Sequence, residues 1–258
     1  MLTLLVALTT QLTAQETIAG RTFLSLGGGM TFGPGELWTL RPHAIINPNL
    51  RPAAGAPPFV DSLVLTESVN AGSAFLFSVT KYPSNNIGIG ADFSYAGLHS
   101  SQDCSMVFDS ADDPRNGSDP DGVSSPNRAA CQDIRSRKRD ALTFDIVPFV
   151  AWRVKNGQIT PILKAGAGLS LGPCTVRVRS ALHELVDAPC SNSKRPTFSG
   201  TIGLYRQTDV ESQFHFELRY SLHRWDVLDG TPGLDGIGNS RTSWRGAFGF
   251  SMGVDFQI

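Results

Sequence analysis

The C-terminal end of the chain alternates between two kinds of side chain. Every second residue from Trp244 to Ile258 is apolar, and all of these except Gly246 are large. The residues between them, from Arg245 to Gln257, are small, polar or charged. A period of two predicts a β-strand that presents an apolar face and a polar face. The pattern suits a barrel that shows its large apolar residues to lipid and its small or polar residues to the lumen.

The same alternation recurs along the chain and predicts further strands. These segments span residues 24–32, 69–79, 87–95, 142–154, 160–171, 198–204 and 213–223. Together with 244–258 they make eight strands. Residues 59–66 are also strand-like, so either the second strand rises well above the bilayer or the barrel has ten strands. Pro148 and Pro161 each remove a ladder donor, so we expect a bulge at each.

The predicted connections alternate in length. Long ones cover residues 34–66, 100–139, 172–195 and 226–241, whereas the short ones hold about four to six residues, including the hairpin pair Asn156-Gly157. Long outer loops and short periplasmic turns are typical of outer-membrane barrels. The predicted fold class is therefore all-β: an eight-stranded antiparallel up-and-down transmembrane β-barrel with long extracellular loops.

Composition excludes two other classes of protein. No stretch reaches the roughly 18 consecutive apolar residues of a membrane-spanning helix, and the mean hydropathy is -0.07. The net charge of -1 leaves no basic surplus for binding nucleic acid. The apolar start of the chain, ending Leu12-Thr13-Ala14, is typical of a signal peptide cleaved after Ala14, although a buried N-terminal strand is the alternative. We expect a signal peptide at 1–14 and a barrel domain at 15–258.

The chain resembles the small bacterial outer-membrane β-barrels of the OmpA transmembrane-domain and OmpX type. The resemblance rests on the signal segment, the eight alternating segments, the loop lengths and the last strand. Such barrels end in a strand of alternating aromatic residues with a terminal Phe, which the assembly machinery reads. Phe248, Phe250 and Phe256 match that pattern here, whereas Ile258 replaces the terminal Phe. The resemblance implies localisation in the outer membrane of a Gram-negative-type bacterium and says little about activity.

All four cysteines fall in the long connections. Cys104 and Cys131 lie in one of them, and Cys174 and Cys190 lie in the next. The periplasm is oxidising, so pairing within each connection is the simplest of the three possible connectivities. Zinc binding is the alternative, but neither pair has the close spacing of metal sites.

An acidic stretch in the second long connection resembles part of a calcium-binding loop. Asp119-Pro120-Asp121-Gly122 fits a fragment of it, but Gly117 and Arg128 stand where the first ligand and the closing glutamate should be. A solvated acidic loop is the preferred interpretation, and we predict no metal site. Divalent ions bridging this loop to lipopolysaccharide remain an option.

The lumen-facing positions carry both acids and bases. The predicted interior charge network consists of Asp92, Asp145, Arg153, Lys164, Glu217, Arg219, Arg245 and Asp255. Buried charges must be paired, and an eight-stranded barrel is only wide enough for its own side chains. A plugged lumen is the preferred interpretation, and a narrow path for ions or small solutes is the alternative.

An enzymatic alternative comes from outer-membrane barrels that modify lipid A. Ser221, His223, His99 and Ser100 are the candidates, and the run 219–223 loosely resembles a motif of lipid A deacylases, with wrong spacing and no Asn. The predicted strand phase points His223 into the lumen, whereas a lipid hydrolase needs its base at the bilayer. We predict no catalytic centre and no cofactor.

Aromatic residues at strand ends fit the girdles found at membrane boundaries. They are Trp152, Tyr82, Tyr95, Tyr220, Trp225 and Trp244. A soluble lipocalin-like ligand carrier is the alternative fold, in which these residues would pack in a core. We expect a monomer with a structural or surface-interaction role through its loops. Its expected partners are outer-membrane lipid, lipopolysaccharide and, during biogenesis, the barrel-assembly machinery, with no nucleic acid.

Overall fold

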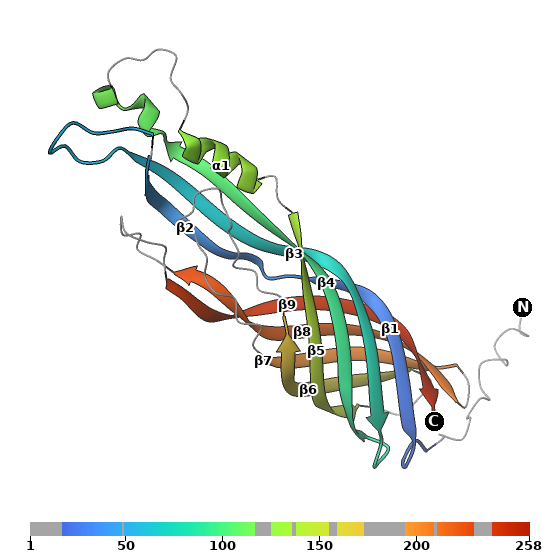
Figure 1. Cartoon of the computed structure of the whole chain (residues 1–258). Coiled ribbons are helices and arrows are strands. Elements are labelled where there is room, and N and C mark those ends of the chain that lie inside the picture. Colours follow the sequence, from blue (N-terminus) through green and yellow to red (C-terminus); the bar gives the residue numbers. More distant parts are fainter. Residues whose placement is uncertain are drawn as a thin grey trace, which may run out of the picture.

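The computed structural model describes residues 17–47, 49–116, 125–135, 138–154, 159–172, 194–208, 211–229 and 239–258. Within these ranges nine strands form one antiparallel sheet, accompanied by one α-helix and two short 3-10 helices (Figure 1). The strands are β1 (Thr22–Phe32), β2 (Gly35–Ile46), β3 (Val60–Lys81), β4 (Ile87–Phe108), β5 (Lys138–Arg153), β6 (Ile159–Leu171), β7 (Arg195–Gln207), β8 (Ser212–Asp229) and β9 (Asn239–Gln257). The helices are η1 (Ser110–Asp112), η2 (Pro114–Asn116) and α1 (Pro126–Arg135).

Eight of these strands close into a ring. The strand order runs β1-β9-β8-β7-β6-β5-β4-β3, and β1 also pairs with β3. The register is regular at the closure, where Leu26 lies opposite Phe77 on one side and Val254 on the other. The predicted eight-stranded antiparallel barrel is therefore confirmed.

A ninth strand corrects the prediction that residues 34–66 are only a connection. β2 follows β1 after Gly33 and Pro34. Both strands pair with β3: β1 pairs with its C-terminal half, and β2 pairs with its N-terminal half. A Cβ on Gly33 would lie 2.4 Å from the Val69 carbonyl oxygen, so only glycine fits this close approach. β2 lies outside the ring, because β9 does not pair with it. β9 pairs with β1 as far as Phe32, and beyond that point its described part pairs with β8 alone.

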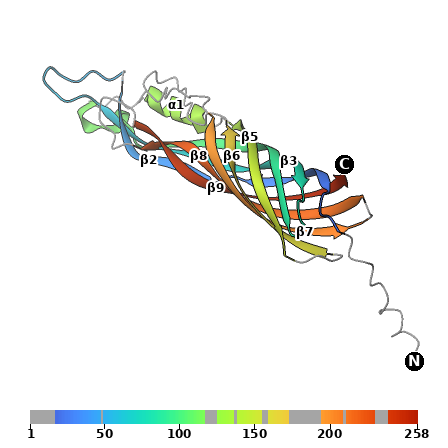
Figure 2. The ribbon, with the colours of Figure 1, turned by 90° about the horizontal axis from the view of Figure 1, so that it is seen from below.

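β3 and β4 are much longer than the bilayer requires. Each has 22 residues, whereas a tilted transmembrane strand needs only about 9–11. Their outer halves leave the barrel together with β2 and carry α1 on one side (Figures 1 and 2). We call this part the head, comprising residues 35–46, 60–69, 98–116 and 125–135. Residues 60–66 therefore extend the second ring strand beyond the barrel.

A bulge in β3 separates the head from the barrel. The β3–β4 register shifts between Asn70 and Ser73. A shift of one residue exchanges the two faces of a strand. Val69, which the simple alternation places on the lipid face, is therefore fully buried in the head, whereas Phe75 is 63% exposed.

The outer face of the ring is apolar. Its exposed large side chains include Leu26, Phe32, Phe75, Ile89, Phe144, Trp152, Leu169, Ile202, Phe216, Tyr220, Trp244, Met252 and Phe256. We call this surface the belt. Placing large apolar groups outside is unfavourable in water and favourable in lipid, so the inverted pattern identifies a membrane barrel. No helix in the described residues has the length and apolar character to cross a membrane.

Two sequence expectations about strand details were wrong. The β5–β6 and β6–β7 registers do not shift around Pro148 and Pro161, so neither proline produces a bulge. Tyr82 and Trp225 do not belong to the girdles, because only 4% and 3% of their surfaces are exposed. Each lies inside the molecule, near opposite ends of the ring.

The head has an apolar core that continues onto the outer end of β8. Members of this core from β2 and β3 are Leu37, Trp38, Leu40, Ile45, Leu63, Leu65 and Val69, and they meet Cys131 and Ile134 from α1. Trp225 and Val227 of β8 belong to the same cluster. The apolar cluster therefore reaches across the outer end of the barrel and covers it.

Candidate functional sites in the lumen and the head

The structure places the predicted charge network inside the barrel. Asp92, Glu217 and Asp255 are each at most 3% exposed, and Asp145, Arg153 and Lys164 are also buried. Their strands follow regular registers, so alternate residues face the lumen from every side. Arg245 lies higher, where its Nη2 donates to the Leu37 carbonyl oxygen at 3.2 Å and links β9 to the head.

Lys164 and Glu217 form the centre of the network. Lys164 Nζ lies 2.5 Å from Glu217 Oε1, and the Tyr205 hydroxyl donates to the same oxygen. Lys164 Nζ also lies 5.0 Å from the centre of the Phe149 ring. A buried ion pair keeps its charges only when additional groups satisfy them, and Tyr205 and Phe149 supply those contacts here.

Two further pairs fill neighbouring levels of the lumen. Arg219 Nη2 donates to Asp92 Oδ2, and His215 Nδ1 lies 2.8 Å from Asp255 Oδ1. The His215 ring also stacks on Tyr205, with 5.3 Å between ring centres. The predicted network omitted His215 and Tyr205, although both occupy lumen phase in their strands. The signal was available, because a buried acid such as Asp255 needs a partner on an adjacent strand.

Arg153 lies at the end of the network away from the head, beside the short turn that contains Asn86. Its Nη2 donates to Thr160 Oγ1 at 3.2 Å, and its guanidinium lies 5.5 Å from the centre of the Tyr82 ring. These contacts place a cation and an aromatic ring across the end of the lumen. The apolar cluster that includes Trp225 and Val227 lies toward the other end of the lumen.

A small cavity remains between the charge network and the apolar cluster. It has a volume of about 50 Å³, and Asp145, Arg219, Ser221 and His223 contribute to its lining. Asp145 Oδ1 and Asp92 Oδ1 are buried without a hydrogen-bond partner in the protein. One water requires roughly 10–15 Å³ of such volume, so the cavity has room for a few waters that can hydrate the Asp145 carboxylate in its lining.

The candidate hydrolase residues do not meet at the lipid surface. His223 is buried in the lumen, where its Nδ1 lies 3.3 Å from Thr197 Oγ1 and 3.8 Å from Asp145 Oδ1. Ser221 lines the lumen cavity, and the buried Ser100 hydroxyl donates to Glu67 Oε1 at 3.0 Å inside the head. His99 is exposed at a different position on β4. The arrangement offers no nucleophile and base facing the bilayer.

One of the two expected disulfides joins β4 to α1. Cys104 and Cys131 are bonded, and both are buried in the head core. Cys174 and Cys190 lie outside the described residues, as do Asp119 and Asp121 of the calcium-like fragment. In the described ranges no group of three or more acidic, His or Cys side chains is arranged to hold a metal.

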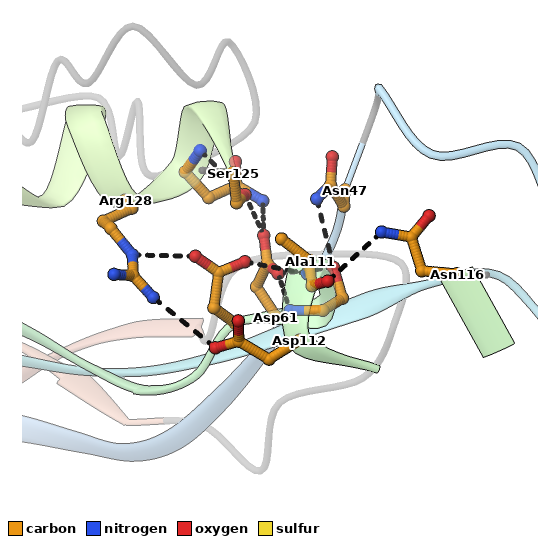
Figure 3. A network of polar contacts seen from close by, with 10 residues as sticks. Asn47, Asp61, Ala111, Asp112, Asn116, Ser125 and Arg128 are labelled. Atoms are coloured by element: carbon orange, nitrogen blue, oxygen red, sulfur yellow. Dashed lines mark hydrogen bonds and ion pairs between the residues drawn. The ribbon is translucent and has the colours of Figure 1, made fainter. Parts of the chain in front are cut away.

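A buried carboxylate organises the far end of the head. Asp61 at the start of β3 is fully buried, and its Oδ1 accepts from the Ser110 backbone N–H at 2.8 Å and from the Ser110 hydroxyl at 2.6 Å (Figure 3). Its Oδ2 accepts from the Ser125 hydroxyl and from Asn127 Nδ2. Asp61 therefore joins β3 to the start of η1 and to the start of α1.

A second acid strengthens the same region. Asp109 is buried and accepts from the Ala111 N–H at 2.9 Å and from Arg128 Nε at 2.7 Å, which ties α1 to η1. Arg128 also lies 3.8 Å from Asp112 (Figure 3). The sequence interpretation missed Asp61, although an acid on the buried face of an otherwise apolar strand end was the available signal.

Replacing Asp61 by Ala should loosen the head without unfolding the barrel. The change leaves several buried donors without an acceptor, at a cost of about 1–3 kcal/mol for each group that water does not reach. Limited proteolysis is expected to cut faster between residues 109 and 127 in Asp61→Ala than in wild type. Asp103→Ala, at an exposed site on β4, is the matched control; equal cutting of both variants would contradict the assigned role.

The predicted assembly strand presents its apolar residues outward. Phe248, Phe256 and Ile258 are exposed on the belt side, and Phe250 is partly exposed in the same phase. The Ile258 N–H donates to the Thr22 carbonyl oxygen at 3.0 Å, so the end of the chain is held against the start of β1.

Comparison with known proteins supports the fold. No family model and no curated protein sequence matches the chain. Among solved structures, the outer membrane protein OprG from Pseudomonas aeruginosa superposes with a TM-score of 0.50 at 11% identity, covering 95% of this chain and 98% of OprG. Neisserial surface protein A follows with a TM-score of 0.42 at 10% identity, covering 93% and 98%. The E. coli outer membrane protein W gives 0.36 at 12% identity, also covering 93% and 98%.

The match to OprG and the belt lead to the same assignment. The chain has the fold of the small bacterial outer-membrane β-barrels, and its apolar residues face outward, as lipid requires. Localisation in an outer membrane follows from this combination. A soluble lipocalin-like barrel is inconsistent with an apolar outer surface.

Proposed function

We propose that this protein is a plugged outer-membrane barrel that holds the head outside the cell for a structural or surface-interaction role. The observation that carries the proposal is a lumen occupied by buried ion pairs beneath a head that has its own disulfide. In the lumen Lys164 pairs with Glu217 and Arg219 pairs with Asp92, and the head is held by its own disulfide. A rigid head above a closed barrel favours a structural or surface-binding role over transport through the barrel.

The proposed partners follow from the surfaces. Outer-membrane lipid surrounds the belt, and lipopolysaccharide lies beside the outer parts of the strands. The barrel-assembly machinery acts during biogenesis on the strand that ends at Ile258. We propose a monomer, because the ring of eight strands closes on itself and leaves no ring edge that needs a partner chain.

Epitope insertion tests the placement of the head. The tip between β2 and β3 is exposed around Ala54 and Gly55, so a short epitope there should be detected by antibody on intact cells. The same epitope between Pro83 and Ser84, in the opposite short turn, should be detected only after the outer membrane is permeabilised. The reverse pattern would contradict the proposed orientation.

A narrow channel is the second candidate, and the cavity beside Asp145 is the observation in its favour. Purified protein in a planar bilayer is expected to show no stepwise conductance, because paired side chains and the apolar cluster fill the lumen. A channel would instead show steps whose size changes in Lys164→Met/Glu217→Gln. Such steps would replace the plugged barrel by the channel as the function.

A further inference from the structure

The belt contains a large hollow on one side of the barrel. A groove of about 480 Å³ crosses the outer face over β9, β1, β3, β4 and β5. Its walls include Leu26, Phe75, Phe77, Tyr95, Phe144 and Met252. This volume lies within the range of roughly 300–1,000 Å³ typical of ligand pockets. The walls are almost entirely apolar.

The groove is hollow because its floor lacks a side chain. Gly28 occupies a lipid-facing position between Leu26 and Met30 and lies opposite Met252 and Phe75 on the neighbouring strands. A Cβ on Gly28 would meet only the Ala74 carbonyl oxygen, at 3.9 Å, so the space above the backbone is open. The neighbouring side chains project around this gap, with Leu26, Phe75 and Met252 each at least half exposed.

The position of the groove identifies what fills it. It lies within the belt, where the surroundings are hydrocarbon, and its lining is almost entirely apolar apart from Ser94 and the hydroxyl of Tyr95. On β4 the outward residues after Tyr95 are Gly97, the exposed His99 and Ser101, so the Tyr95 end reaches the outer boundary of the belt. The other end reaches Val254, close to the periplasmic end of β9. A chain entering from the outer leaflet can therefore lie along the groove.

We propose that the groove binds one acyl chain of an outer-leaflet lipid, with the ester end at Tyr95 and the methyl end near Met252. The inference rests on the proposed membrane placement. Lipid tails are as apolar as the belt, so retention comes from closer packing against the aromatic walls rather than from transfer out of water. A glycine floor allows that close packing.

Photocrosslinking tests the site in the full-length protein. The protein is reconstituted in vesicles of phosphatidylethanolamine and phosphatidylglycerol that contain a trace of phosphatidylcholine with a diazirine on one acyl chain. One probe carries the diazirine near the ester, and the other carries it near the methyl end. Mass spectrometry then compares labelling of the groove with labelling around Ile202 of β7, an exposed belt position on another side of the ring.

The variants fill or open the groove. Gly28→Leu places a side chain on the floor, and Phe75→Ala removes a wall; both should lower groove labelling to the level at Ile202. Gly200→Leu is the matched control, because Gly200 is an exposed glycine of the belt and a Cβ there meets nothing within 4 Å. It should leave labelling of the groove unchanged.

We expect roughly fivefold more labelling in the groove than at Ile202, because an acyl chain in the groove makes closer dispersion contacts with the protein. The ester-end probe should label Tyr95, and the methyl-end probe should label Met252. Even labelling around the belt, labelling that survives Gly28→Leu, or the reverse order of the probes would overturn it. So would a protein–protein crosslink at the groove that Gly28→Leu abolishes, because a second copy would then cover the site.

A change of gel mobility on heating separates this proposal from the proposed function. If the protein shifts on heating but the probes label the belt evenly, only the groove proposal is refuted. A wild-type protein that neither enters vesicles nor shifts on heating refutes the membrane placement, and the groove proposal falls with it.

Discussion

Replacing Lys164 by methionine is expected to destabilise the barrel by about 3–5 kcal/mol, because removing one partner of a buried ion pair leaves the other charge uncompensated. Glu217 is 1% exposed and would keep the Tyr205 hydroxyl as a hydrogen-bond donor but lose the ammonium group that lies against its carboxylate. Urea unfolding of the protein in lipid vesicles, followed by loss of the heat-dependent gel shift, measures the change. The midpoint should fall clearly below that of wild type.

A double variant and a surface control sharpen this test. Lys164→Met/Glu217→Gln removes both charges but keeps a carbonyl that accepts from Tyr205, so it should recover most of the lost stability. Arg206→Met changes an exposed cation on β7 and should stay within about 0.5 kcal/mol of wild type. If Lys164→Met and Arg206→Met behave alike, the lumen pair does not hold the barrel together.

Replacing Cys104 and Cys131 by serine is expected to release α1 from the head. The disulfide closes a loop with a sequence separation of 27 residues, for which the chain-entropy relation gives about 3.5 kcal/mol. Two buried serines would also replace sulfur atoms in the apolar core. Limited proteolysis should therefore cut the segment from 109 to 135 much faster than in wild type.

The barrel provides the internal control for the disulfide variant. Its ring closes through β1, β3 and β9, and none of these pairings involves the disulfide. The heat-dependent gel shift should therefore persist in Cys104→Ser/Cys131→Ser. Loss of that shift together with faster cutting would show that head and barrel fold as one unit, contrary to the account.

The ring was predictable because each transmembrane strand repeats the period of two without interruption. Phe248 and Phe256 on β9, like Leu163 on β6, lie on the expected outer face. The same phase assigned Lys164 and Glu217 to the lumen, where both are buried, and pairing within one connection anticipated the Cys104–Cys131 bond. These features depend on local alternation and on chain connectivity, which a single sequence contains.

The head was not predictable in the same way. Among the described residues β2 pairs with β3 alone; it carries two register shifts and includes Pro42, so its alternation is broken. The bulge between Asn70 and Ser73 exchanges the faces of β3 without any proline or charged residue to indicate it. Asp61 contacts Ser110, Ser125 and Asn127, which are far from it in the sequence. Its role therefore depends on tertiary contacts that a local pattern does not contain.

The most direct test of the central claim is the mobility of the protein from isolated outer membranes on SDS gels, with and without boiling. We predict that the protein fractionates with the outer membrane and migrates differently until it is boiled, because a closed barrel with an apolar belt resists SDS. A protein that is freely soluble and shows no shift would contradict it, since the exposed belt would then have no lipid to cover it.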